Sequence, residues 1–317
     1  MMNTHAHLVS IDKLCKAFEK VPKPNKIRGD PLQMDAAEED IKRLVDTDPR
    51  SLRAKDFKSY LGCDTTGGVG DLRYLLPTLL RIWSEQLCLQ SSSFIQMLQK
   101  QLASKDFLYR RLDEDLRQLV VEFMRNAILE RIGNEHALCI RGRCLTHRWF
   151  DVFANHGVIT KDIPTIWEEL WSMKLEGHAI AVVQYASCLV CREDSNPVFA
   201  PRSFWKGGGP PILWEYESWG FDERWKSTNV DFLRRTLSAE YVSAKLKEAA
   251  RLMSDNHNRQ IAQKVLEESH RAPGRLAKRC YILPQVLSTP SSPYTTTTSW
   301  EGFGDAGADG AGVKQQV

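Results

Sequence analysis

The sequence contains no hydrophobic run long enough to cross a bilayer. Its longest run covers residues 179–191 and includes Gln184 and Ser187, whereas a membrane-spanning helix needs about 20 predominantly apolar residues. The first residues, MMNTHAHLVSIDKLCK, also lack the positive segment and the apolar segment of a secretory signal. We therefore expect a cytoplasmic protein with no membrane partner, in which the eight cysteines are reduced thiols.

The sequence also lacks an excess of one charge. It has 43 Lys and Arg residues against 40 Asp and Glu residues, a net charge of +3, and the two signs are mixed along the chain. This distribution differs from the concentrated basic footprint of a dedicated nucleic-acid-binding protein. Spacings of Ser/His/Asp, HExxH or paired carboxylates that would support catalysis are missing as well. Their absence favours a protein without enzymatic activity.

Strand patterns are scarce, and helical periodicity dominates the sequence. From Asp71, a plausible N-cap, apolar residues recur at helical spacing as far as Leu87. Pro77 lies inside this run and predicts a kink or a new helix start. Further helices are expected over 113–132, from Asp162, over 178–192 after a separating Gly177, from Ser238, over 257–270 and over 274–285.

Successive one-sided helices with short connections predict an all-α fold of stacked antiparallel helical hairpins. We expect one domain over residues 50–287, preceded by an N-terminal helical extension at 1–49. The Pro- and Gly-rich residues 197–211 predict an irregular loop. Residues 288–317 contain too few apolar side chains to offset the entropy of ordering, which predicts a disordered tail.

Residues 59–80 contain a combination of short sequence motifs that also occurs in other proteins. These elements are Tyr60, the turn Thr66-Gly67-Gly68, Asp71, and the helix with Tyr74, Leu76 and Pro77. In this combination the chain resembles an uncharacterised bacterial family of all-helical proteins, although Thr78 stands where that family has Arg. The likeness extends more weakly to about residue 253. It implies a helical domain and transfers no catalytic residues.

Cysteine and histidine residues suggest a metal-binding or redox alternative. Four of them lie within one short stretch, and two more form a CxxC motif; the six are His136, Cys139, Cys144, His147, Cys188 and Cys191. Zinc favours such ligands, but the spacing of the first four differs from that of known zinc fingers. The CxxC lies toward the end of an apolar helix, where the helix dipole disfavours a thiolate. We expect these two cysteines to pack in the core and expect no cofactor.

Two basic clusters suggest a second alternative, contact with nucleic acid. One cluster contains Arg141 and Arg143, and the other contains Arg271, Arg275, Lys278 and Arg279. Phosphate binding would require both clusters to converge on one face. Basic residues near helix ends can also be simply exposed to solvent, or interact favourably with the negative end of the helix dipole.

Tryptophan is abundant, with nine residues in the chain. Trp83, Trp167 and Trp171 lie on apolar helix faces and are expected in the core. Four others surround the Pro- and Gly-rich loop, namely Trp205, Trp214, Trp219 and Trp225. They either anchor this loop or line a groove for a partner, since aromatic residues are enriched at recognition surfaces. The sequence favours a helical interaction or scaffold protein with an unknown protein partner.

Overall fold

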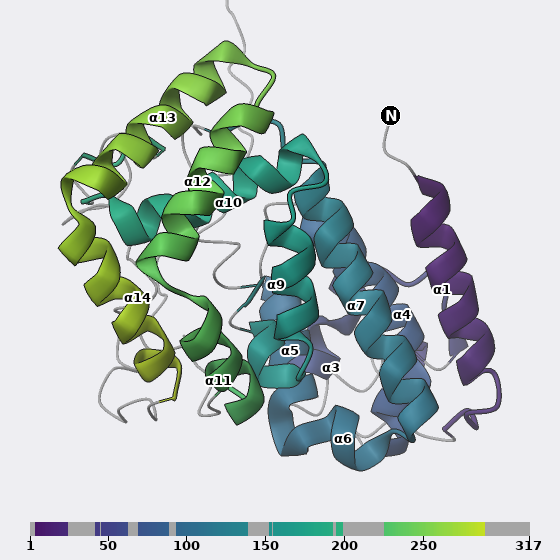
Figure 1. The fold of residues 1–317 in the computed structure, drawn as a ribbon. Coiled ribbons are helices and arrows are strands. Elements are labelled where there is room, and N and C mark those ends of the chain that lie inside the picture. Colours follow the sequence, from purple (N-terminus) through teal and green to yellow (C-terminus); the bar gives the residue numbers. More distant parts are fainter. Residues whose placement is uncertain are drawn as a thin grey trace, which may run out of the picture.

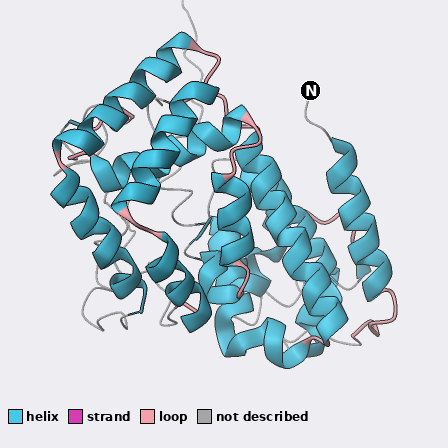
Figure 2. Cartoon of the chain, in the orientation of Figure 1, coloured by secondary structure: helices cyan, strands magenta, loops and turns pink. Residues whose placement is uncertain are grey.

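A computed structural model describes residues 4–24, 42–44, 46–62, 69–88, 93–138, 152–153, 155–192, 195–198 and 225–288. Every regular element in these ranges is a helix (Figure 2), which confirms the predicted all-α class. None of the helices in the described ranges combines the length and apolarity needed to span a membrane. The predicted disordered tail, apart from Ser288, and the predicted loop over 197–211, apart from its first two residues, lie outside the described residues.

The N-terminal half is built around two long helices, α4 and α7, that pack against each other and against α1 (Figure 1). Shorter helices pack around them, and 3-10 turns at Ala54–Phe57 and Ser104–Asp106 connect some of these. The α-helices of this half are α1 (Thr4–Phe18), α3 (Lys58–Gly62), α4 (Val69–Cys88), α5 (Ser93–Ala103), α6 (Phe107–Arg111) and α7 (Glu114–Gly133).

The C-terminal half surrounds one buried helix, α10 (Glu176–Val190). This helix contacts α7, α9, α12, α13 and α14, so it has almost no exposed side. Its long apolar run, noted in the sequence, is explained by this position because a helix surrounded by others is hydrophobic on every face. The remaining helices are α9 (Ile163–Trp171), α11 (Ser227–Thr236), α12 (Ala239–Leu252), α13 (Asn256–Arg271) and α14 (Pro273–Ser288).

Side-chain caps fix the starts of three helices. Asp113 accepts a hydrogen bond from the Leu116 backbone N–H at 3.0 Å, and Ser238 accepts one from Tyr241 at 3.1 Å. Asp255 caps α13 in the same way. These caps satisfy backbone donors that have no partner within the helix. They confirm the starts predicted for α7 and α12.

The helix boundaries predicted at Asp71 and Gly177 were wrong, and so was one of the two alternatives predicted for Pro77. Asp71 lies inside α4, which begins two residues earlier at Val69. Pro77 lies within α4 and does not start a new helix, whereas the kink stays a prediction. Because Leu75, Leu76, Leu79 and Leu80 are almost fully buried, packing offsets the one backbone hydrogen bond that Pro77 removes. Gly177 does not separate two helices, because it is the second residue of α10.

Gly177 instead permits a close crossing of α7 and α10. A Cβ atom at this position would lie 2.3 Å from the carbonyl oxygen of Gly133 and 2.7 Å from that of Ile132. Next to the crossing, the His178 ring nitrogen Nε2 lies 3.2 Å from the Leu129 carbonyl oxygen. The glycine therefore joins the two halves of the fold at backbone contact distance.

The predicted core tryptophans are buried, as expected. Trp167 and Trp171 stack with ring centroids 4.8 Å apart, and Tyr185 of α10 meets both rings edge-on. Trp83, a residue of α4, is fully buried in the core. Such aromatic pairs add stability beyond the area that they bury.

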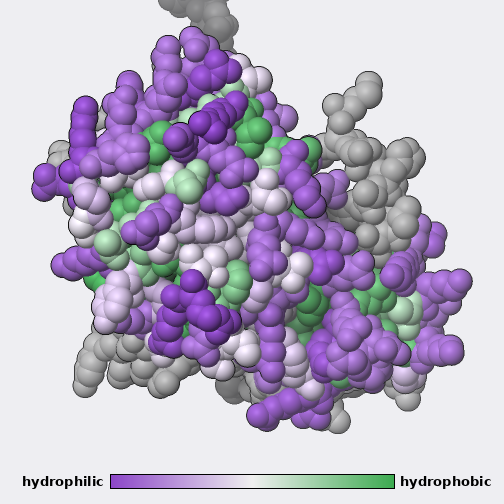
Figure 3. Space-filling view, viewed as in Figure 1, coloured by the Kyte–Doolittle hydropathy of each residue, from purple (hydrophilic) through white to green (hydrophobic). Residues whose placement is uncertain are grey.

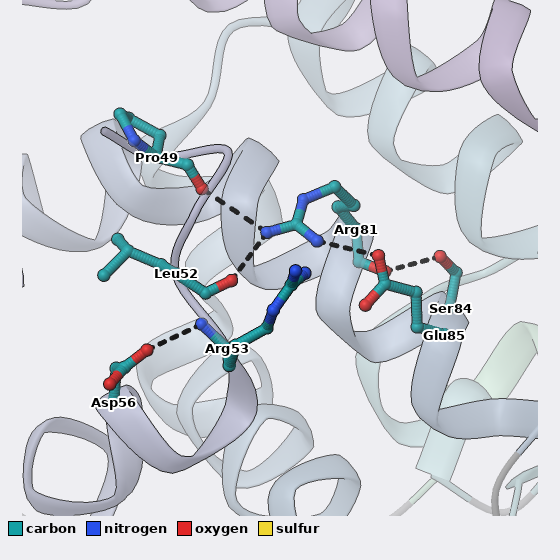
Figure 4. A network of polar contacts seen from close by, with 7 residues as sticks. All are labelled: Pro49, Leu52, Arg53, Asp56, Arg81, Ser84 and Glu85. Carbon is teal, nitrogen blue, oxygen red and sulfur yellow. Dashed lines mark hydrogen bonds and ion pairs between the residues drawn. The ribbon is translucent and has the colours of Figure 1, made fainter. Parts of the chain in front are cut away.

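Arg81 of α4 fixes the chain that precedes α3 (Figure 4). Its Nη2 donates to the carbonyl oxygens of Leu52 at 2.8 Å and Pro49 at 3.3 Å, and its Nη1 lies 2.7 Å from Glu85 Oε1. One guanidinium thus satisfies two carbonyl groups of a turn and stays paired with a carboxylate. This contact has a structural role.

Candidate functional site

Of the four tryptophans predicted to form a recognition surface, Trp225 is described, and Trp205, Trp214 and Trp219 lie outside the described residues. The Trp225 side chain is 8% exposed and packs on Gly157, where a Cβ atom would lie 2.7 Å from the indole. The next residue, Lys226, hydrogen-bonds the Gly157 carbonyl oxygen through its backbone N–H. The C-terminal end of the Trp-rich segment, defined as residues 199–225, is therefore anchored on the helical body.

The proposed metal and redox residues fall into two groups. Cys139, Cys144 and His147 lie outside the described residues, whereas Cys188 and Cys191 are buried at the end of α10. Burial raises the pKa of the Cys191 thiol to about 12 and has the same effect on Cys280 of α14. Thiols with such pKa values stay protonated at neutral pH. In the described ranges, no three His, Cys, Asp or Glu side chains gather as metal ligands, and His136 is part of no such group.

Of the two basic clusters predicted for nucleic-acid contact, the structure describes one. Arg141 and Arg143 lie outside the described residues. Arg279 donates to the carbonyl oxygens of Cys191 at 2.6 Å and Cys188 at 3.0 Å. Arg275 reaches the carbonyl oxygen of Val190 at 3.2 Å and Glu268 at 3.0 Å. The two arginines therefore cap the C-terminus of α10, whose last carbonyl groups have no partner within the helix.

The other two members of this cluster lie at the surface. Arg271 is exposed and lies 3.9 Å from the carboxylate of Glu267, and Lys278 is exposed on α14. Two of the four residues of this cluster are therefore used to cap α10. Its convergence with Arg141 and Arg143 stays a prediction, because those two residues lie outside the described residues.

A polar junction that the sequence analysis missed lies where residues 155–162 meet α6, α7 and α11. Asn229 of α11 donates to the carbonyl oxygens of Gly157 at 3.0 Å and Thr160 at 2.7 Å. From the other side, the Lys161 backbone N–H donates to the Tyr109 hydroxyl at 2.9 Å. These bonds hold the end of a helical stretch (155–159) and the turn that follows it between elements that are distant in sequence.

The interior of the junction contains titratable groups with few partners. His156 is 1% exposed, and neither ring nitrogen has a hydrogen-bond partner. Burial, assisted by the nearby Arg125, lowers the His156 pKa to about 3, so the ring is neutral at physiological pH. Arg125 and Asp162 lie 3.8 Å apart, and burial raises the Asp162 pKa. An enclosed imidazole with this pKa cannot serve as a base for a substrate in solution.

The outer side of the junction gathers positive charge around one aromatic ring. The cationic groups of Arg117, Lys161 and Lys226 lie 5.0, 5.3 and 5.6 Å from the centroid of the Tyr109 ring. Arg117 pairs with Glu114, and Lys226 lies 2.6 Å from Asp106. Lys161 has no carboxylate partner in the described part of the chain.

Two further exposed arginines lie on the same short helix as Tyr109. Arg110 and Arg111 follow Tyr109 directly, are exposed, and form no ion pair within the described ranges. We define the cationic surface as Tyr109 together with Arg110, Arg111, Arg117, Lys161 and Lys226. Figure 3 shows that the surface over α6, at the bottom of the view, is mainly hydrophilic. The site is thus suited to bind charged groups.

No protein-family model, curated protein or solved structure matches the chain. The resemblance of residues 59–80 to an uncharacterised bacterial family therefore stays a prediction. Function has to be inferred from the chemistry of the site.

Proposed function

We propose that the chain is a helical scaffold protein that binds a protein partner through the cationic surface, beside the end of the Trp-rich segment. Its cationic groups come from α6, α7, the segment before α9 and the start of α11. A surface assembled from several elements presents its groups more rigidly than a single loop does. The proposal retains the sequence-based hypothesis of an interaction module and gives it a site.

The observation that supports this function most strongly is the crowding of three like charges around Tyr109. Two like charges about 8 Å apart repel each other by roughly 0.5 to 2 kcal/mol at effective dielectric constants between 80 and 20. The negative face of the ring and the carboxylates of Asp106 and Glu114 offset part of this repulsion. Lys161 is the cation of the three that has no carboxylate partner among the described residues, and an acidic group of a bound partner would supply one.

The alternatives have less support among the described residues. Arg275 and Arg279 are occupied by the end of α10, which weakens the case for a nucleic-acid surface there. The raised pKa of Cys191 weakens the case for a reactive or metal-binding CxxC. We further propose a cytoplasmic location, because the cysteines Cys191 and Cys280 form no disulfide and suit a reducing compartment.

Site-specific photo-crosslinking tests the proposal. A photoreactive amino acid is placed at position 110 or 161 of the full chain, and the matched control is position 264, an exposed lysine on α13. We expect one recurrent protein adduct from positions 110 and 161 that is absent from position 264 and decreases in Trp214→Ala. Absence of an adduct at both test positions, or an equal yield at position 264, contradicts the proposal. An adduct unchanged by Trp214→Ala removes the Trp-rich segment from the binding surface.

A further inference from the structure

We infer that the cationic surface recognises an acidic peptide segment, one that presents at least two Asp or Glu side chains to Lys161 and the α6 arginines. This inference rests on the proposed function and specifies the chemistry of the partner.

Positive charge on the cationic surface exceeds the negative charge paired with it in the described part of the chain. Five cationic side chains belong to the surface, and the structure supplies carboxylate partners to two of them, Arg117 and Lys226. Arg110, Arg111 and Lys161 have none among the described residues. Complementary potentials across an interface favour a partner of the opposite sign.

Lys161 and the α6 arginines are close enough in the fold to meet one peptide segment. Lys161 lies above the same ring as the paired cations Arg117 and Lys226, and the arginines of α6 continue the sequence directly after that ring. The unpaired charges therefore lie on neighbouring elements. An extended peptide places alternate side chains on the same side about 7 Å apart. Alternate acidic residues of one short segment can thus approach separate cations, and arginine binds carboxylates through two parallel hydrogen bonds.

The surroundings of the Tyr109 ring favour an acidic peptide over a nucleic acid. Binding of single-stranded nucleic acid combines phosphate contacts with bases stacked on aromatic faces. The Tyr109 ring already has three cationic groups near it, and its hydroxyl accepts a hydrogen bond from Lys161. It is therefore poorly placed to stack a base. Several phosphate contacts would also need more unpaired cations than the three described here.

The test measures fluorescence anisotropy of a labelled peptide of alternating Glu and Ser residues with the full chain at low salt. The variants are Arg110→Glu/Arg111→Glu and, separately, Lys161→Glu. The charge-matched control for the double variant is Lys264→Glu/Arg271→Glu, which changes two exposed residues of α13. Circular dichroism confirms that each variant folds, and Lys161→Gln replaces Lys161→Glu if the latter unfolds.

We expect at least a tenfold loss of peptide affinity in the double variant and a clear loss in the position-161 variant. The control should change affinity less than twofold, a matched Lys-Ser peptide should not bind, and added salt should weaken binding. Absence of binding to the acidic peptide, equal losses in test and control, or tighter binding of oligo(dT) than of the peptide overturns the inference. If one of these results is found and crosslinking still yields a specific adduct at position 110, the proposed function stands. Only the inference that the partner is an acidic peptide is then wrong.

Discussion

At the scale of single residues, burial determines which side chains of this protein can take part in proton or thiol chemistry. The His156 ring is enclosed without a hydrogen-bond partner, and Cys191 and Cys280 are enclosed as protonated thiols. Desolvation disfavours the charged form of each group, which lowers the pKa of the histidine and raises that of the cysteines. These residues therefore affect stability and are unsuited to catalysis.

The pH dependence of stability tests the account of His156. Its pKa is about 3 in the folded protein and 6.5 ordinarily, so the unfolded chain takes up a proton below pH 6.5 while the folded chain does not. Stability is thus retained above pH 6.5 and falls as the pH decreases toward 3. Between pH 7.5 and 5.5 this one residue should cost about 1.4 kcal/mol of unfolding free energy.

Urea unfolding of wild type and His156→Leu at both pH values measures this contribution. Other groups, including Arg125, Asp162 and His178, are common to both proteins, so the difference between the two pH slopes isolates His156. The matched control is His270→Leu on the exposed side of α13, which should keep the wild-type slope. An equal slope in wild type and His156→Leu would contradict the described burial.

Alkylation of the native protein tests the burial of the thiols. Cys15 is exposed, whereas Cys188, Cys191 and Cys280 are buried. Brief treatment with iodoacetamide at pH 8, followed by mass spectrometry of peptides, should label Cys15 and leave the three buried thiols unmodified until urea is added. Rapid native labelling of Cys188 or Cys191 would revive the redox hypothesis.

At the scale of helices, α10 depends on its neighbours at both ends. Near its first turn Gly177 lets α7 approach to backbone contact, and at its last turn Arg275 and Arg279 bind the free carbonyl groups. Both devices join segments far apart in sequence. A helix so thoroughly buried relies on them because solvent cannot satisfy its ends.

Replacement of Gly177 by alanine should destabilise the protein by about 2 to 3 kcal/mol, because the added methyl group meets two backbone carbonyl oxygens that cannot move independently. Gly274→Ala is the matched control, since Gly274 is likewise the second residue of its helix and has open space around it. It should stabilise by about 0.5 kcal/mol. Chemical denaturation measures both, and a neutral Gly177→Ala would rule out the close crossing.

Arg279→Met should lower the unfolding free energy by roughly 1 to 3 kcal/mol, the range for hydrogen bonds made by a charged group. The long apolar stem is kept, so the loss reports the missing cap of α10. Lys278→Met, one residue earlier and exposed, should change stability by less than about 0.5 kcal/mol. Equal effects of the two substitutions would mean that Arg279 does not cap α10.

At the scale of the whole molecule, the sequence predicted most of the long helices, but it predicted neither α5, α6 and α11 nor the points where helices meet. Periodic apolar residues and caps such as Asp113 and Ser238 are local signals, and they predicted helix positions well. The helix start considered at Pro77 and the separation assigned to Gly177 were wrong because tertiary packing, which local rules do not include, decides the effect of both residues. These local signals alone were enough to predict the all-α fold class.

The candidate site could not be predicted for the same reason. Tyr109, Lys161 and Lys226 are each unremarkable in sequence, and only the fold brings their side chains together. In contrast, the basic run around Arg275 and Arg279 attracted attention as a surface cluster, although both side chains are committed to α10. Among the predicted site residues that the structure describes, Trp225 lies beside the cationic surface, through its neighbour Lys226.

Hydrogen–deuterium exchange with mass spectrometry tests most directly the claim that the cationic surface around Tyr109 is the binding surface. The full chain is compared with and without a saturating Glu-Ser peptide at low salt. We predict slower exchange in peptides covering residues 107–117 and 155–161, with no change over residues 256–288. Protection confined to 256–288, or no protection at the cationic surface despite bound peptide, would contradict the account.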